Sequence, residues 1–260
     1  MGVRTIVPFL HRLTRLTLVL VVALGVARTA SAASVTRVFT IVIPPAQEDA
    51  FNQGVKAWEK CLHDHGSKHT TLAYSAETGD LDRYLFLDER GSWANMDVHE
   101  AAAKACGSIL LTQVQPHASR ALSEIAILNA KDTYMPGGDP EPAPMMWVVA
   151  YRIKPGQRQS LNDALAKLAT AAAKTHWEAH FEGYDIQGSG QGAEDFLLVW
   201  PNKSWADIGQ APKLSDTQVI ASVYGKAAAR ANQRKLRATI ADYWTDAWQY
   251  QQGLSYIPGK

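Results

Sequence analysis

The five residues IPPAQ at positions 43–47 are similar to IKPGQ at positions 153–157, which lies 110 positions later in the chain. Two further echoes follow in the same order: SWANM at 92–96 returns as SWADI at 204–208, and YMPG at 134–137 returns as YIPG at 256–259. Ordered self-similarity of this kind is typical of an internal repeat. The sequence therefore predicts a duplicated domain.

The composition is typical of a globular protein with apolar cores. The chain has 260 residues, of which 47% are hydrophobic and 20% charged, and its formal net charge is +1. A nearly neutral chain gives no indication of a nucleic-acid or anionic-membrane partner. Residues 136–144 contain four prolines and two glycines. This stretch predicts a semi-extended linker between a first unit at 34–135 and a second unit at 145–260.

Residues 1–33 have the build of a secretory signal peptide. A basic head precedes an apolar run at 16–27, and the small residues Ala30-Ser31-Ala32-Ala33 follow it. The run is shorter than the about 20 residues that a membrane-spanning helix needs. We therefore predict cleavage after Ala32 or Ala33. The mature protein is then expected to be soluble, periplasmic or secreted, and not held in a membrane.

Each unit shows the same order of secondary-structure signals. Strands are marked by β-branched and aromatic runs, and helices by apolar residues three or four positions apart. The expected strands lie at 38–43, 69–76, 83–87 and 124–129, then at 147–153, 176–186, 196–200 and 247–251. The expected helices lie at 46–65, 92–119, 157–175 and 215–243.

A unit with the order β-α-β-β-α-β folds most simply as a four-stranded antiparallel sheet with both helices on one face. The other face of the sheet is bare and needs a cover, which the second copy can supply. The sequence therefore predicts an α+β fold. We expect two tandem ferredoxin-like βαββαβ units, packed sheet to sheet as an intrachain pseudo-dimer.

Two local patterns carry a resemblance to a known superfamily: a strand that ends in Pro155-Gly156-Gln157 before a helix, and a strand at 196–200 that leads to Ser204-Trp205. In these features the chain resembles the dimeric α/β-barrel superfamily, which includes antibiotic-biosynthesis monooxygenases and stress-responsive A/B barrel proteins. Members are commonly homodimers that pack sheet on sheet, so the resemblance implies a built-in dimer here. The superfamily spans many chemistries, and the fold alone names no reaction.

Haem-degrading relatives in this superfamily pair a Trp at the end of the third strand with a His in the second helix of the same unit. Here Trp200 stands at the first position, but no His follows it. The first unit has His99 in its helix, but Asp88 stands where the Trp would be. The split pair argues against haem, and no cofactor is predicted.

Strand alternation places three polar side chains of the second unit on one face: His180, Glu182 and Tyr184. With Arg152 on the first strand of that unit they form the candidate catalytic set. A His, a carboxylate and a phenol around one cavity can exchange protons with a small substrate. The candidate ligand-binding residues are Trp200, Asp195 and Tyr74. The alternative is that these groups face solvent or pair with one another.

The only cysteines, Cys61 and Cys106, lie in the first unit on its two expected helices. Export permits a disulfide between them. The alternative is a pair of buried free thiols, which behave as small apolar groups. His63, His65 and His69 cluster at the end of the first helix, and we interpret them as a solvated helix end. No metal site is predicted.

Two functions stay open at this point. The first is a non-catalytic exported protein that binds a small apolar or aromatic ligand between its sheets. The second is a cofactor-independent monooxygenase- or isomerase-like enzyme with its site in the second unit. No phosphate-binding loop, nucleophile elbow or zinc signature points elsewhere. The expected partner is a small molecule, and the expected assembly is a monomer or a homodimer.

Overall fold

The computed structural model describes residues 34–98, 100–137, 141–190 and 193–259. The predicted signal peptide at 1–33 and residues 138–140 of the predicted linker lie outside this part of the chain. No helix among the described residues is long and apolar enough to cross a membrane.

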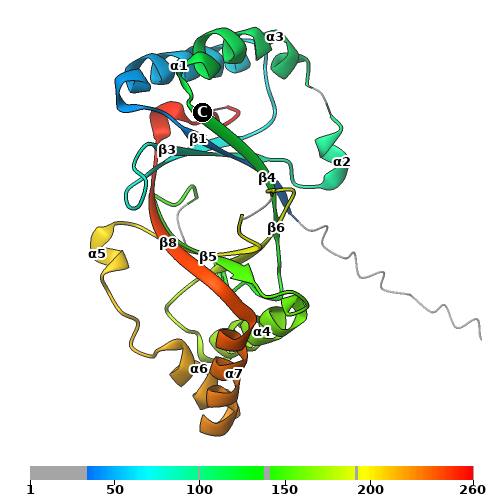
Figure 1. Cartoon of the computed structure of the whole chain (residues 1–260), viewed down its shortest axis with the longest axis vertical. Helices are drawn as coiled ribbons and strands as arrows, with labels where there is room; N and C mark the ends of the chain where they lie inside the picture. Colours follow the sequence, from blue (N-terminus) through cyan, green and yellow to red (C-terminus); the bar gives the residue numbers. More distant parts are fainter. Residues whose placement is uncertain (1–33, 99, 138–140, 191–192, 260) are drawn as a thin grey trace, which may run out of the picture. The chain divides into compact units, whose positions relative to one another are not determined.

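The first half of the described chain runs from β1 to β4 (Figure 1). Its strands are β1 (Val35–Val42), β2 (Thr71–Ala76), β3 (Arg83–Glu89) and β4 (Arg120–Leu128). Its helices are α1 (Glu48–Asp64), α2 (Trp93–Met96) and α3 (Ala101–Ile109). A π-helical turn, Leu110–Val114, follows α3 directly.

The second half runs from β5 to β8. Its strands are β5 (Met145–Ile153), β6 (Glu182–Gln187), β7 (Phe196–Asn202) and β8 (Ile240–Tyr250). Its helices are α4 (Arg158–Thr175), α5 (Trp205–Ile208), α6 (Asp216–Tyr224) and α7 (Lys226–Thr239). Ser215 and Gln218 form a capping box at the start of α6, which satisfies backbone N–H groups that have no partner inside the helix.

The eight strands close into one antiparallel barrel in the order β1-β3-β2-β8-β5-β7-β6-β4. The predicted α+β barrel is confirmed at this level. The four strands of each half are contiguous, and their order is β4-β1-β3-β2 in the first half and β8-β5-β7-β6 in the second. The halves meet edge to edge, because β2 pairs with β8 and β4 pairs with β6. A closed ring leaves no strand edge unpaired.

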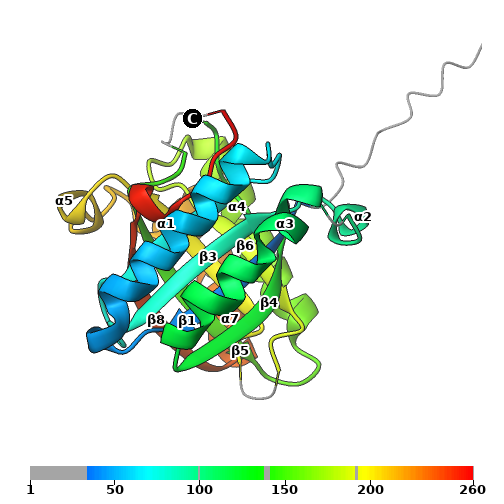
Figure 2. The same ribbon diagram turned by 90° about the horizontal axis from the view of Figure 1, so that it is seen from above.

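Alternation along the strands divides their side chains between the interior of the barrel and an outer surface covered by helices. On the first half, Phe51 and Val55 of α1 pack against Tyr84 and Phe86 of β3. Figure 2 shows α1 and α3 lying across β1, β3 and β4. On the second half, helices α4, α6 and α7 pack against one another and against β7 through a larger apolar cluster. The intervening residues of each strand face the interior.

Two predicted boundaries in the second half are wrong. The predicted strand at 176–186 shrinks to Glu182–Gln187, because His176 ends α4 in a left-handed conformation and Trp177 still packs among the helices. The predicted helix at 215–243 breaks at Gly225, whose φ is 85°, and gives way to β8 at Ile240. The last strand therefore begins seven positions before the predicted start at 247.

A candidate ligand cavity inside the barrel

The interior of the barrel holds a cavity of about 710 Å³. Every strand contributes to its wall, with residues that alternate along the chain, such as Leu85, Leu87 and Glu89 of β3. Much of the wall is apolar or aromatic. Its larger apolar members are Leu72, Leu85, Met146, Leu197, Trp244 and Trp248. A concave apolar site with a few polar groups is the usual form of a small-molecule binding site.

The charged part of the wall is predominantly acidic. The ionisable carboxyl groups that line the cavity are Glu89, Glu124, Glu141, Glu182, Glu194 and Asp246. Arg83 and Arg90 are the arginines of the lining. Arg83 donates a 2.9 Å hydrogen bond to Asp246 and lies over the ring of Trp248, while Arg90 pairs with Asp88 at 2.6 Å. Both arginines thus already have a carboxylate partner.

Polar residues from both halves face the cavity. Tyr184 of β6 donates a 2.9 Å hydrogen bond to Glu182. Burial, and then the charge of Glu182, raise the pKa of Tyr184 well above its usual range. Burial also raises the pKa of Tyr74 on β2, with further contributions from Tyr250, Glu89 and Glu182. These phenols therefore stay protonated at physiological pH.

The carboxyl groups of the first half are perturbed in the same direction. Burial raises the pKa of Glu124 on β4 to about 7, and the charge of Glu194 adds to the effect. Glu89 at the end of β3 is exposed, and the pKa of its carboxyl group is raised by partial desolvation and then by the charges of Glu141 and Asp88. A carboxyl group that titrates near neutral pH can both give and accept a proton. Neither residue was selected from the sequence. The alternation of Glu124, Ala126 and Leu128 on a strand is the signal that could have found the first.

Some of the site residues predicted from the sequence line this cavity, and the others lie elsewhere. Glu182, Tyr184 and Tyr74 line the cavity together, although Tyr74 comes from the other half. His180 precedes β6, is not part of the lining, and packs edge-on against Tyr134 with ring centroids 5.7 Å apart. Two members of the four-residue catalytic set therefore share the cavity, and the set as a whole does not converge there.

Arg152 and Asp195 line a second pocket of about 400 Å³ that shares Glu194 with the main cavity, and the guanidinium group of Arg152 lies over the ring of Trp244 in the wall of that cavity. Arg152 lies 3.8 Å from Asp242, and Asp195 accepts a 2.7 Å hydrogen bond from the backbone N–H of Ile153. Trp200 packs into the outer apolar cluster beside Phe181. Of the residues considered for haem, Asp88 binds Arg90 and His99 lies outside the described residues.

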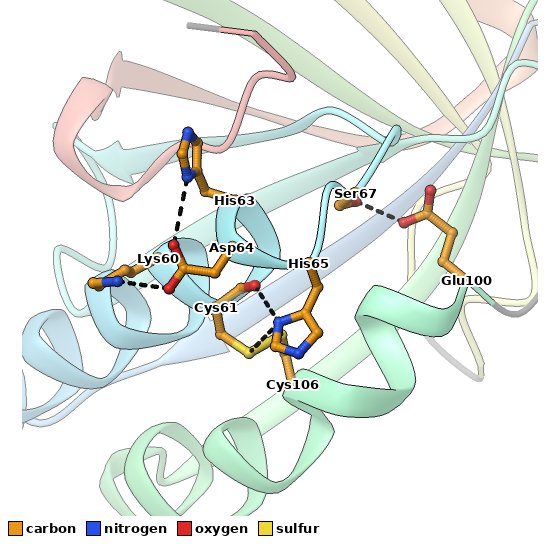
Figure 3. The surroundings of a disulfide bond; sticks show 8 residues. All are labelled: Lys60, Cys61, His63, Asp64, His65, Ser67, Glu100 and Cys106. Atoms are coloured by element: carbon orange, nitrogen blue, oxygen red, sulfur yellow. Dashed lines mark hydrogen bonds and ion pairs between the residues drawn. A yellow bond between two sulfur atoms is a disulfide. The ribbon is translucent and has the colours of Figure 1, made fainter.

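Cys61 of α1 and Cys106 of α3 form a disulfide, with their Cα atoms 5.8 Å apart (Figure 3). The Nδ1 atom of His65 lies 3.6 Å from the sulfur of Cys61 and 3.9 Å from that of Cys106. These three groups are the set within the described chain whose ligand atoms are close enough to share a metal ion. Thiolates are the metal ligands that cysteine supplies, and here both sulfurs are bonded to each other.

The histidines near the end of α1 do not act as one group. His63 lies 3.6 Å from Asp64, and both side chains are exposed. His69 lies 3.6 Å from Glu100, which also accepts hydrogen bonds from the hydroxyl of Ser67 and the backbone N–H of Lys68. Glu100 thereby ties the start of α3 to the segment before β2.

No protein-family model matches the chain, and no curated protein matches it in sequence. Solved structures do match. A proposed monooxygenase from Lactobacillus acidophilus NCFM matches with a TM-score of 0.54 at 5% identity, covering 87% of this chain and 97% of that chain. An anthrone oxidase-like protein matches with a TM-score of 0.53 at 12% identity, covering 87% and 94%. A proposed monooxygenase from Fusobacterium nucleatum subsp. nucleatum ATCC 25586 matches with a TM-score of 0.50 at 10% identity, covering 84% and 93%. At these identities the likeness shows a shared α+β barrel fold.

Proposed function

We propose that this chain is an exported protein that binds a small, largely apolar or aromatic ligand inside its barrel. The observation that carries this proposal is the cavity of about 710 Å³, to which all eight strands contribute side chains. Its volume lies within the range of roughly 300–1,000 Å³ that is usual for small-molecule sites. Its aromatic and branched aliphatic walls provide apolar contact area, and burial of that area drives binding.

We also infer that each half is a ferredoxin-like βαββαβ unit and that the chain arose by tandem duplication within the dimeric α/β-barrel superfamily. The equal strand order of the two halves supports this. So do the echoes at 43–47 and 153–157, which stand at the junction of a strand with a helix in both halves. On this account the second half takes the place of the partner subunit.

The binding proposal is tested with N-phenyl-1-naphthylamine, a neutral dye that fluoresces strongly in an apolar site. We expect the mature protein, residues 34–260, to bind it. Ala126 of β4 lines the cavity and is buried, so Ala126→Phe should fill the space and abolish the fluorescence. Ala121→Phe, on the exposed face of the same strand, is the control and should bind normally. Equal binding by both variants would place the dye elsewhere and contradict the proposal.

A second function is favoured by one observation: carboxyl and phenol groups with raised pKa values line a cavity with much apolar wall. Such groups could move protons on a bound substrate. Since matching structures include proposed monooxygenases and an anthrone oxidase-like protein, anthrone is a reasonable test substrate. An enzyme of this kind would consume oxygen with anthrone. Glu124→Gln would slow the reaction by about 100-fold if Glu124 is the base. If the protein consumes no oxygen with anthrone, only the binding function remains as a proposal.

Export is tested by expressing the full chain in a bacterial host and determining the amino terminus of the purified protein. The proposal expects Ala33 or Ser34 as the first residue and recovery from the periplasm or the medium. Recovery of an uncleaved chain from the cytoplasm would contradict it.

A further inference from the structure

The cavity wall carries more acidic than basic side chains, and this excess bears on the charge of its ligand. Six carboxyl groups line it, against two arginines. One arginine is paired with a lining carboxylate, Asp246, and the other with Asp88. Among the described residues, Glu89 and Glu124 form no ion pair with a cationic side chain. Glu124 is half-buried, whereas Glu89 is exposed at the end of β3. A carboxylate that is partly removed from water raises the free energy of the protein unless a positive charge or hydrogen-bond donors accompany it.

A polar group without a partner points to the same place. Tyr74 is only 2% exposed, and it lines the cavity. Its ring packs against Tyr250, but its hydroxyl group forms no hydrogen bond with any described residue. The hydroxyl is not among the fully buried polar atoms that lack a partner, so it is reached from the cavity. A ligand in the cavity would supply the missing partner.

Tyr74, Glu89 and Glu182 line the same cavity, and the charges of both carboxylates contribute to the raised pKa of the phenol. These three side chains come from two strands of the first half and one of the second, and each carries oxygen that can accept hydrogen bonds; Glu182 already accepts one from Tyr184. An ammonium group has three donors, which can reach more than one of these side chains, and its positive charge is opposite in sign to the carboxylates. The rings of Tyr74 and Tyr184 can add attraction to a cation that lies over them. Leu72, Leu85 and Leu197 provide an apolar wall for the rest of the ligand.

We propose that the barrel cavity selects ligands that carry a protonated amine on an apolar or aromatic body, with the amine held by Tyr74, Glu89 and Glu182. This inference rests on the proposed ligand-binding function and adds the charge of the ligand. The competing possibility is that the lining carboxyl groups stay protonated and bind a neutral oxygen acceptor. In that case a neutral ligand would bind at least as well as a cationic one.

The test uses three probes with one body and different charges: 1-naphthylmethylamine, 1-naphthylmethanol and 1-naphthoic acid. Each is titrated at pH 7.5 against mature protein that contains N-phenyl-1-naphthylamine, and displacement of the dye gives the affinity. We expect the amine to bind about tenfold more tightly than the alcohol, and the acid about tenfold more weakly still, because a positive charge close to the carboxylates of the cavity is favoured and a negative charge is disfavoured.

Variants locate the effect. Glu89→Gln should weaken binding of the amine by about tenfold and leave the alcohol unchanged, because only the amine gains from the carboxylate charge. Tyr74→Phe should weaken the amine several-fold through loss of one acceptor. Asp49→Asn removes the same unit of charge from the exposed start of α1 and is the control for Glu89→Gln. Tyr243→Phe alters a tyrosine that is 63% exposed and is the control for Tyr74→Phe. Glu182→Gln provides a second charge variant if Glu89→Gln does not fold.

The outcomes separate the two proposals. If the dye binds and the alcohol or the acid equals the amine, the cation inference is overturned while the binding function stands. If neither the dye nor any naphthyl probe binds, the binding function fails and the inference fails with it. A preference for the amine that survives Glu89→Gln and Glu182→Gln together would also overturn the assigned position of the amine.

Discussion

Arg83 and Asp246 form an ion pair that spans β2: the Nη2 atom of Arg83 on β3 lies 2.9 Å from the Oδ1 atom of Asp246 on β8. The pair joins the two halves of the barrel within the cavity wall. Both side chains are largely buried, and the guanidinium group also lies over the ring of Trp248. Loss of one member of a buried pair leaves the other charge without compensation.

Arg83→Met should therefore lower the free energy of unfolding by about 2–4 kcal/mol, since Asp246 would remain buried without its partner. Adding Asp246→Asn should restore part of the loss. Urea denaturation of the single and double variants measures both effects. Arg230→Met, at an exposed position of α7, is the control. If Arg83→Met were as stable as the control, the pair would contribute nothing to the closure of the barrel.

Stability should fall as pH rises from about 4.5 to 7. Burial raises the pKa of Glu124 from 4.5 to about 7, so in this window the folded state holds a proton that the unfolded chain has released. The unfolded state then binds fewer protons, and the free energy of unfolding decreases with pH. Glu59 and Asp132, whose pKa values burial raises to about 7, act in the same direction.

Glu124→Gln removes the part of this effect that belongs to Glu124. We expect the variant to unfold at the same urea concentration as the wild type near pH 4.5, and to be more stable at pH 8 by about 1–3 kcal/mol. Asp49→Asn should show no such gain. A gain that is equal at both pH values would show that the proton of Glu124 is not responsible.

Loss of the disulfide should destabilise the protein but leave its affinity for a ligand in the cavity unchanged. Cys61 and Cys106 close a loop across a separation of 45 residues, for which the chain-entropy account gives roughly 4 kcal/mol, with about 2–4 kcal/mol usual in practice. We expect the variant with Ser at both positions to lose stability by that amount in urea. Its affinity for N-phenyl-1-naphthylamine should be unchanged, because the bridge joins α1 to α3 on the outside of the barrel. Lost binding in the folded variant would contradict this.

Two helical glycines should respond to alanine in opposite ways. A Cβ atom on Gly54 of α1 would lie 2.0 Å from the carbonyl oxygen of Gln113, so the helix and the turn after α3 would have to separate. We expect Gly54→Ala to cost about 1–3 kcal/mol. A Cβ atom on Gly107 of α3 meets nothing within 4 Å, so Gly107→Ala should stabilise by about 0.5–1 kcal/mol. Thermal melts of the two variants decide the matter, and shifts of the same sign would show that the packing of Gly54 is not as described.

The barrel could be predicted because its determinants are local and repeated. The strand patterns and the paired echoes gave the order of elements in both halves, and the covered faces followed from alternation. The site was harder, since it depends on which strands become neighbours. Glu124 lies on β4, and β4 pairs with β6 only when the ring closes.

The positions of the other selected residues show the same limit. His180 shares the parity of Glu182 and Tyr184, but β6 begins only at Glu182. Arg152 shares the parity of the lining residues Val148 and Ala150 and keeps the regular register, but it stands at the end of that register, where it lines the second pocket. Trp200 faces outward because Leu197, Val199 and Pro201 take the inward positions of β7. Parity assigns a face only while the strand is regular.

Because a single chain closes the ring, the two halves of the cavity wall can differ in sequence. In a barrel made by two identical subunits, every substitution appears twice, and the interior has twofold symmetry. Here a change of one codon alters one wall. An acidic Glu124 can stand on one side while the corresponding wall of the other half is built differently, and a ligand without twofold symmetry can be matched along its whole outline.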